Sequence, residues 1–445
     1  MINKQELKLL RDALATLEEG TRTLPEFAPS VDVERAADVL AEVATRMQDN
    51  YPYYHPQYAG QMLKPPHPVA RIAYAMSLWV NPNNHALDGG RASSAMEKEC
   101  IVELGRMFGW EQPLGHLAGG GTMANLEALW VAGRLSPGKK VVASGQAHYT
   151  HSRITEVLGI PFAAVPVDTS GRMDVAAVEK LLAAGDVGTV VVTIGNTGLG
   201  SVDPLDDILA LQDRYEFRVH ADAAYGGYFG LAGELHAEQR RHYDRLSDVD
   251  SIVIDPHKHG LQPYGCGCVM FRDPSVGTLY KHDSPYTYFS SGDMHLGEIT
   301  LECSRPGASA VALWATHRLL PPVPGGEFGD DLDRCLRAAR SLWRALYKSS
   351  YFTPLMQPEL DIVVYAVNAD TTSTASKRAR EVFDAAAERD LHLALIEVPA
   401  ELFGAYAPDF TVDSASVTCL RSVLMKPEHE EWVERLTALL EASAQ

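Results

Sequence analysis

The chain has 445 residues, of which 46% are hydrophobic and 22% are charged, and its formal net charge is −19. This composition is typical of a folded protein with a sizeable core, and the negative charge disfavours nucleic acid or an anionic membrane surface as a partner. The N-terminus shows no basic and apolar signal sequence, and no run of about 20 apolar residues occurs. We therefore expect a soluble, cytoplasmic protein of roughly two or three domains, or of one large domain with appendages.

Six cysteines are scattered along the chain, which is typical of reduced thiols in the cytosol. Cys266 and Cys268 would supply half of a metal site, but no second pair of cysteines or histidines follows at the spacing of a zinc finger. We therefore predict no metal site.

Residues 1–60 are predicted to form an N-terminal helical segment. Leucines recur at positions 7, 10, 14 and 17, and a second helical pattern of apolar residues extends from Ala36 to Met47. These helices expose an apolar stripe that needs a partner, either on the same domain or on a second subunit. Tyrosine and proline are frequent in residues 51–68, which predicts an extended or looped connection.

Residues 61–320 are predicted to form a large domain with an α/β fold. Strand and helix patterns alternate between residues 115 and 275, which is typical of a mostly parallel sheet with helices on both faces. In such a sheet, ligands bind beyond the carboxyl ends of the strands. The polar residues that follow predicted strands or begin predicted helices are Thr122, His148, Thr197, Asp222 and Lys258.

A glycine-rich turn precedes the helix predicted for residues 123–134. Gly119, Gly120 and Gly121 stand before Thr122. Glycines at a helix start let backbone N–H groups approach an anion, which the helix dipole also attracts. The turn is therefore a candidate phosphate site, although a glycine-rich sequence by itself is usually only a turn.

Two further stretches at strand ends carry charged side chains. Lys258 ends an Asp-Pro-His-Lys run after a predicted buried strand, and a partly desolvated lysine can lose its proton and form a Schiff base with an aldehyde. Asp222 ends an earlier strand and is followed by the small residues Ala223 and Ala224. Pyridoxal 5'-phosphate (PLP) needs such a lysine, a carboxylate for its ring nitrogen, donors for its phosphate and room for its flat ring. PLP is therefore the predicted cofactor.

These two stretches, His-Ala-Asp-Ala-Ala-Tyr-Gly-Gly at residues 220–227 and Asp-Pro-His-Lys at residues 255–258, resemble the group II PLP-dependent amino-acid decarboxylases of fold type I. The archaeal-type tyrosine/aspartate decarboxylases carry a similar Asp-Pro-His-Lys run. The resemblance extends from about residue 58 to about residue 421. It implies a PLP-binding domain, a small C-terminal domain and a homodimer with composite active sites, in which the N-terminal segment wraps around the other subunit.

The resemblance also implies roles for individual residues. The glycine-rich turn matches the family's phosphate-binding motif through Gly121 and Thr122. His148 corresponds to the histidine that stacks on the cofactor ring. Thr197 matches a further cofactor contact, whereas Asn196 departs from the family's usual threonine at its position.

Lys258 is then the lysine that forms the Schiff base, and Asp222 is the carboxylate for the ring nitrogen. Ala224 and His257 belong to the same two motifs and are expected to line the cofactor site. His151 lies one helical turn after the stacking histidine and is predicted to be structural.

Residues 327–445 are predicted to form a small α+β C-terminal domain after a linker rich in proline and glycine at residues 320–326. Arg421 matches the arginine that holds the substrate α-carboxylate in related enzymes, and a guanidinium suits a carboxylate. An exposed arginine at a strand end is the alternative. Arg305 belongs to a Ser-Arg pair that supports the site in the family, and a salt bridge to a carboxylate is its alternative role.

The leading functional hypothesis is α-decarboxylation of an aromatic or acidic L-amino acid to the amine and CO₂. Tyr288 is the predicted acid that protonates Cα, and Tyr286 is the alternative. A PLP-dependent carbon–carbon lyase, aldehyde synthase or transaminase on the same scaffold is the second hypothesis. An inactive binding protein is the third, and the intact set of Lys258, Asp222 and His148 argues against it.

Overall fold

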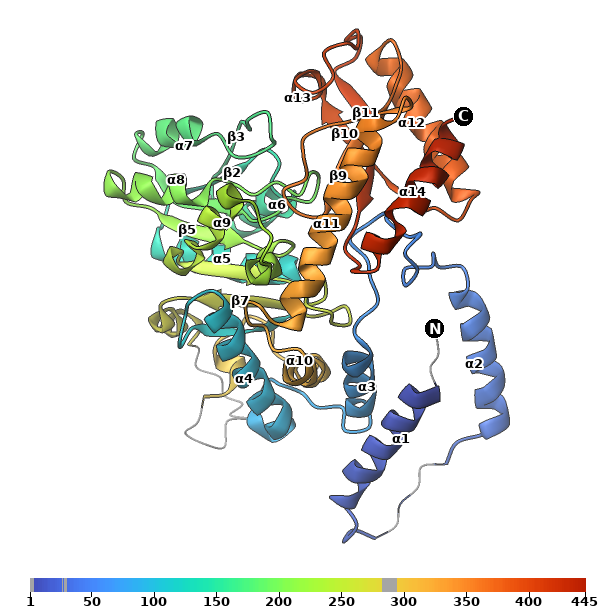
Figure 1. Cartoon of the computed structure of the whole chain (residues 1–445). Helices are drawn as coiled ribbons and strands as arrows, with labels where there is room; N and C mark the ends of the chain where they lie inside the picture. Colours follow the sequence, from blue (N-terminus) through green and yellow to red (C-terminus); the bar gives the residue numbers. More distant parts are fainter. Residues whose placement is uncertain (1–3, 26, 28–29, 282–293) are drawn as a thin grey trace.

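The computed structural model describes residues 4–25, 27, 30–281 and 294–445 (Figure 1). Its large sheet is built from β1 (Leu114–Ala118), β2 (Lys140–Ser144), β3 (Phe162–Val165), β4 (Val187–Thr193), β5 (Arg218–Asp222), β6 (Ser251–Ile254) and β7 (Gly267–Phe271). Within the described residues, these seven strands lie in the order β1-β7-β6-β5-β4-β2-β3. β2 to β6 are parallel, whereas β7 is antiparallel to its neighbours β1 and β6. The predicted mostly parallel α/β sheet is confirmed.

The composition of the central strands explains their place in the sheet. β4 has the sequence Val-Gly-Thr-Val-Val-Val-Thr, and all of its residues are buried. The four residues of β6, Ser-Ile-Val-Ile, are buried as well. β-branched side chains suit a strand that is covered on both faces. Because β1 has the same direction as the parallel strands, the carboxyl ends of β1, β2, β4, β5 and β6 meet at one edge.

Helices flank this sheet (Figure 1). They are α3 (Pro68–Ser77), α4 (Arg91–Met107), α5 (Gly121–Leu135), α6 (Thr150–Leu158), α7 (Val175–Leu182), α8 (Leu205–Ala210), α9 (Ala237–Tyr243) and α10 (Ala308–Leu319). α5 contacts β4, β5, β6 and β7, and α4 contacts β1 and α10. Nη1 of Arg305 lies 2.7 Å from Oε1 of Glu97 in α4, and both side chains are buried. The salt bridge considered for Arg305 is therefore present.

The C-terminal part contains a second, antiparallel sheet in the order β10-β11-β9-β8, formed by β8 (Phe352–Pro354), β9 (Ile362–Val367), β10 (Ala394–Pro399) and β11 (Ser416–Val423). Its helices are α11 (Glu327–Lys348), α12 (Thr372–Ala387), α13 (Ala400–Gly404) and α14 (His429–Ala444). The chain that leads into the large domain is tied to this part, because Nζ of Lys426 donates a hydrogen bond of 2.6 Å to the carbonyl of Tyr58. The small α+β domain is confirmed.

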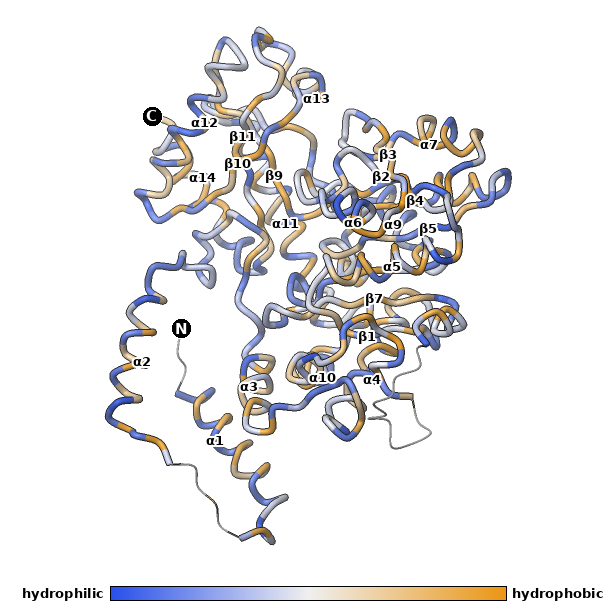
Figure 2. Tube along the Cα trace, turned by 180° about the vertical axis from the view of Figure 1, so that it is seen from behind, coloured by the Kyte–Doolittle hydropathy of each residue, from blue (hydrophilic) through white to orange (hydrophobic). Residues whose placement is uncertain are grey.

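The N-terminal helices α1 (Lys4–Glu19) and α2 (Val33–Met47) have no buried residue among those that the structure describes. They stand beside the body of the molecule in Figures 1 and 2. An ion pair of 2.8 Å joins Glu6 of α1 to Arg71 of α3. Apolar side chains on both helices remain exposed, for example Leu7 at 58% and Leu40 at 66%. In the described part of the chain, no helix has the length and apolar composition to cross a membrane.

Candidate active site

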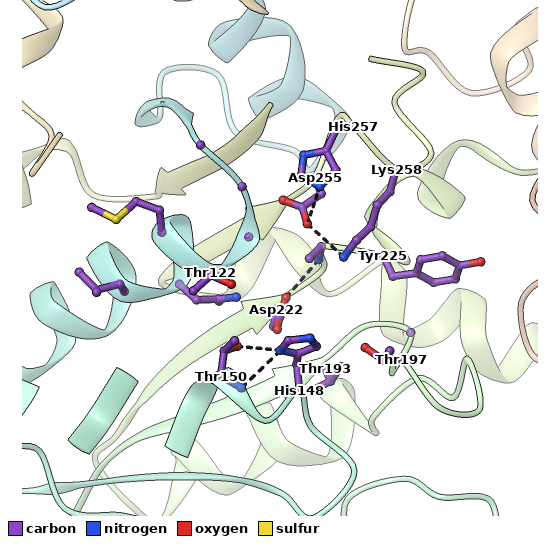
Figure 3. A pocket seen from close by; sticks show the side chains of 18 of the residues that line it. Thr122, His148, Thr150, Thr193, Thr197, Asp222, Tyr225, Asp255, His257 and Lys258 are labelled. Carbon is purple, nitrogen blue, oxygen red and sulfur yellow. Dashed lines mark hydrogen bonds and ion pairs between the residues drawn. The ribbon is translucent and has the colours of Figure 1, made fainter. Parts of the chain in front are cut away.

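A cavity of about 540 Å³ lies at the edge of the large sheet where the parallel strands end (Figure 3). Its walls come from the loops that follow β1, β2, β4, β5 and β6, so side chains far apart in the sequence meet there. The predicted site residues that line it are Gly121, Thr122, His148, Thr197, Asp222, Ala224, His257 and Lys258. The rule that ligands bind beyond strand ends thus located residues of one common cavity.

Lys258 follows β6 and points its amine toward a buried carboxylate. Nζ of Lys258 lies 3.0 Å from Oδ2 of Asp255, and Nε2 of His257 lies 3.6 Å from the same oxygen. The Lys258 side chain is 21% exposed, whereas that of Asp255 is 3% exposed. Burial lowers the pKa of His257, so this ring is neutral at pH 7 and the ion pair belongs to Lys258 and Asp255.

Asp222 is the last residue of β5, and both of its carboxylate oxygens are held. Oδ2 lies 2.8 Å from Nε2 of His151, and Oδ1 accepts a hydrogen bond of 3.2 Å from the backbone N–H of Ala224. Burial by itself raises the pKa of Asp222, but the hydrogen bond and charge of His151, followed by the charge of Lys258, bring the pKa below its usual value. Asp222 is therefore an ionised carboxylate inside the protein.

His148 presents a flat ring to the cavity from the loop after β2. Nδ1 of His148 lies 2.8 Å from Oγ1 of Thr150 (Figure 3), and this contact orients the ring. Burial lowers the pKa of His148, so the imidazole is neutral near pH 7. A neutral, oriented ring suits stacking on an aromatic cofactor.

The start of α5 forms another wall of the cavity. Gly120 has a φ of 152°, which favours glycine, and a Cβ on Gly121 would stand 2.8 Å from Oδ2 of Asp255. These glycines therefore bring the backbone N–H groups of the helix start close to the strand ends. Oε2 of Glu302 already accepts a hydrogen bond of 3.2 Å from the N–H of Gly119, so an anionic group that accepts hydrogen bonds fits at this helix start.

The chemistry of the cavity fits PLP. Oγ1 of Thr193, Oδ1 of Asp255 and Nδ1 of His257 are buried in its wall and have no hydrogen-bond partner among the described residues. Buried polar atoms usually have hydrogen-bond partners, and a molecule bound in the cavity would supply them. An amine at Lys258, a carboxylate at Asp222 and the N–H groups of the helix start are the groups that an aldehyde, a ring nitrogen and a phosphate require.

Arg421, considered from the sequence as a site residue, does not belong to the described residues that line this cavity. Arg421 lies in β11, is 5% exposed and donates a hydrogen bond of 3.2 Å to Oε1 of Gln61, and its role in substrate binding stays a prediction. Tyr288 and Tyr286 lie outside the described residues.

Asn196, the departure from the family motif, shapes the turn after β4. Its side chain accepts a hydrogen bond of 2.8 Å from the N–H of Leu199 and donates one of 3.2 Å to the carbonyl of Gly171. The neighbouring Thr197 lines the cavity. The asparagine therefore maintains the loop rather than facing the ligand.

Several other residues of the cavity wall have no role predicted from the sequence motifs. Thr193 and Asp255 stand at strand ends, so the same rule that found Asp222 would have found them. Tyr225 also lines the cavity, and its hydroxyl donates a hydrogen bond of 2.5 Å to Asp361 in the small domain. Glu302 had no local signal, because it reaches the cavity from a distant segment.

The comparison with known proteins agrees with this geometry. Residues 129–368, which include Asp222 and Lys258, match the family model described as the pyridoxal-dependent decarboxylase conserved domain. The chain is 26% identical to an L-tyrosine decarboxylase of Enterococcus faecium over an alignment of 491 positions, which covers 85% of this chain and 80% of the relative. It is 31% identical to a probable L-tyrosine/L-aspartate decarboxylase of Methanothermobacter thermautotrophicus over 310 residues, which cover 69% of this chain and 82% of the relative.

A solved structure shows the same fold. The crystal structure of Oryza sativa TDC with PLP and tryptamine matches with a TM-score of 0.79 and 16% identity, covering 100% of this chain and 99% of that one. The family model spans more than half of this chain, and its residues meet around a cavity that fits PLP. The chain therefore belongs to the pyridoxal-dependent decarboxylase family and is a PLP-dependent amino-acid decarboxylase.

Proposed function

We propose that the enzyme removes the α-carboxylate of an aromatic or acidic L-amino acid and releases the amine and CO₂. The observation that carries this proposal is that Lys258, Asp222 and His148 line one cavity beside a glycine-rich helix start. Relatives named as tyrosine and tyrosine/aspartate decarboxylases support the substrate class.

The cofactor and the protein divide the chemistry. Bound PLP supplies an aldehyde that condenses with the substrate amine and a protonated ring that accepts the electron pair left by CO₂. Lys258 is the proposed amine that holds the aldehyde before substrate arrives, and Asp255 keeps that amine in place at 3.0 Å. The ionised Asp222 holds a proton at the ring nitrogen. The N–H groups at Gly121 and Thr122 bind the phosphate.

Further residues complete the cofactor site or act on the substrate. His148 stacks on the ring, and Ala224, His257 and Thr197 complete the cofactor wall. Arg421 is proposed to hold the substrate carboxylate; its Nε has no hydrogen-bond partner among the described residues, which leaves this donor available. Tyr288 is proposed to protonate Cα after CO₂ has left, with Tyr286 as the alternative acid.

A panel of common L-amino acids, assayed for CO₂, amine and aldehyde, tests this proposal. Release of CO₂ with an equal amount of amine from an aromatic or acidic amino acid is the expected result. Aldehyde formed with CO₂ and peroxide identifies an aldehyde synthase, and aldehyde formed without CO₂ identifies a carbon–carbon lyase. Protein that never shows a visible cofactor band when PLP is added supports the inactive binding protein.

We also propose a homodimer with composite active sites and a cytoplasmic location. The exposed apolar side chains of α1 and α2 support the dimer, because an uncovered apolar face of this kind marks an interaction surface. Five of the six cysteines are buried free thiols, which is typical of a reducing compartment.

A further inference from the structure

His151 supports Asp222 from outside the cavity. It lies in the first turn of α6, is 1% exposed and does not belong to the described residues that line the cavity. Its Nε2 lies 2.8 Å from Oδ2 of Asp222. Since Oδ1 accepts from the N–H of Ala224, the protein fixes both carboxylate oxygens and therefore the plane of the carboxylate.

The hydrogen bond also places a proton on Nε2 of His151. An ionised carboxylate only accepts hydrogen bonds, so Nε2 of His151 is the donor. Nδ1 is buried and has no partner among the described residues. Within this part of the chain, the contact with Asp222 is thus the hydrogen bond that the ring makes.

We propose that His151 is a positioning residue for decarboxylation, which orients the Asp222 carboxylate and keeps it ionised so that it holds a proton at the cofactor's ring nitrogen. This inference rests on the proposed role of Asp222. Burial favours a neutral carboxyl group, and a protonated Asp222 would no longer attract the proton of the ring. A donor at 2.8 Å opposes this effect, because a hydrogen bond to the charged form stabilises that form.

Two amide variants separate this role from a purely structural one. His151→Gln places an amide N–H near the position of Nε2, whereas the side chain of His151→Asn is one methylene shorter and does not reach Asp222. Both variants carry the same polar group, so they differ in the hydrogen bond rather than in polarity. His151→Leu removes the donor with an apolar side chain and replaces His151→Asn if that variant does not fold.

Three properties of each variant are measured, two on the holoenzyme and one on the apoenzyme. The ¹⁵N resonance of ring-labelled PLP reports the protonation of the ring nitrogen, titration of the apoenzyme reports PLP affinity, and steady-state kinetics separate kcat from KM. For His151→Asn we expect the resonance to move toward the unprotonated position, PLP affinity to fall, and kcat to fall on the order of ten- to a hundredfold with KM little changed. His151→Gln should retain the resonance and most of the activity.

The outcomes distinguish a failure of this inference from a failure of the proposed function. Asp222→Asn serves as the reference and should shift the same resonance. If it does not, the role of Asp222 is wrong and the inference falls with it. If Asp222→Asn shifts the resonance but His151→Asn does not, only the inference on His151 is overturned. The same holds if His151→Gln and His151→Asn show equal losses of activity and equal decreases in melting temperature while the resonance is unchanged.

Discussion

Nζ of Lys258 lies 3.0 Å from Oδ2 of Asp255, three residues earlier in the chain. The carboxylate is buried, and its second oxygen has no hydrogen-bond partner among the described residues. Because Asp255 directly follows β6, the rigid sheet fixes the position of the lysine amine. The pair places this amine within the cavity that contains Asp222 and His148.

Replacement of this lysine should abolish the function of the site. Lys258→Ala removes the amine that we assign to the cofactor aldehyde, so we expect loss of the visible absorption band and of steady turnover. Lys377→Ala is a suitable control, because the Lys377 side chain is 78% exposed and forms a surface ion pair with Glu381 at 3.7 Å. An active Lys258→Ala enzyme with the parent absorption band would disprove the assignment.

The close approach of α5 to β6 makes a second prediction. A Cβ on Gly121 would stand 2.8 Å from the Asp255 carboxylate, whereas the same addition on Gly404 meets no neighbouring group of the described residues within 4 Å. Gly121→Ala must therefore displace either the helix start or Asp255, and we expect its PLP affinity to fall about tenfold or more, which corresponds to about 1.4 kcal/mol. Gly404→Ala should bind PLP like the parent.

Titration of each apoenzyme with PLP measures both values. Equal affinities for the two variants would show that the start of α5 does not contact the phosphate.

The residues that could be predicted from the sequence are those whose place follows from the end of a strand. Asp222 and Lys258 end or follow buried strands, and parallel strands place their carboxyl ends at one edge. The partner of Asp222 could not be predicted this way, because His151 is 71 residues away and meets it only when α6 packs on the sheet. Glu302, separated from Gly119 by 183 residues, was missed for the same reason.

A pH-dependent prediction follows from His429, which ties α14 to the chain before the large domain. Nε2 of His429 lies 3.0 Å from the carbonyl of Pro56, and Nδ1 lies 3.3 Å from the N–H of Lys426. One nitrogen donates and the other accepts, so the ring is neutral. Burial lowers the pKa of His429 from 6.5 to about 3.

The unfolded chain therefore takes up a proton at this histidine near pH 6.5, whereas the folded chain does not until about pH 3. The free energy of unfolding should decrease as the pH falls between these values, by up to about 1.4 kcal/mol per pH unit for one proton. In urea unfolding at pH 7 and pH 5, His429→Gln should reduce this dependence. His236→Gln should reduce it less, because burial lowers the pKa of the exposed His236 without the large shift found at His429. An unchanged dependence in His429→Gln would contradict the prediction.

The apolar faces of α1 and α2 predict a dimer. Light scattering should give twice the chain mass of 48.6 kDa. Val43 in α2 is 49% exposed and Val412 in the small domain is 57% exposed, so the pair permits a matched test. Val43→Glu should produce monomers with reduced activity, because a buried charge at an interface is unfavourable. Val412→Glu should remain dimeric, and an active monomeric parent enzyme would rule out composite sites.

The last prediction concerns the acid that protonates Cα. Once CO₂ has left, the product depends on whether a proton or oxygen reaches the substrate carbon first. A phenol with a well-placed proton gives the amine, and its absence gives oxygen time to react and form an aldehyde, ammonia and peroxide. Tyr288→Phe keeps the aromatic ring and removes the proton donor. We expect this variant to bind PLP normally, to form the amine more slowly and to divert part of the product to aldehyde.

Tyr286→Phe is the matched control, since it removes the same group two residues earlier, and we expect it to keep the parent rate and product. Amine, aldehyde and peroxide are measured together, so a change in product is separated from a general loss of activity. If Tyr286→Phe diverts the product and Tyr288→Phe does not, Tyr286 is the acid. If both variants form amine at the parent rate, the proton comes from another group, and the neutral His148 at the cavity wall is the next candidate to test.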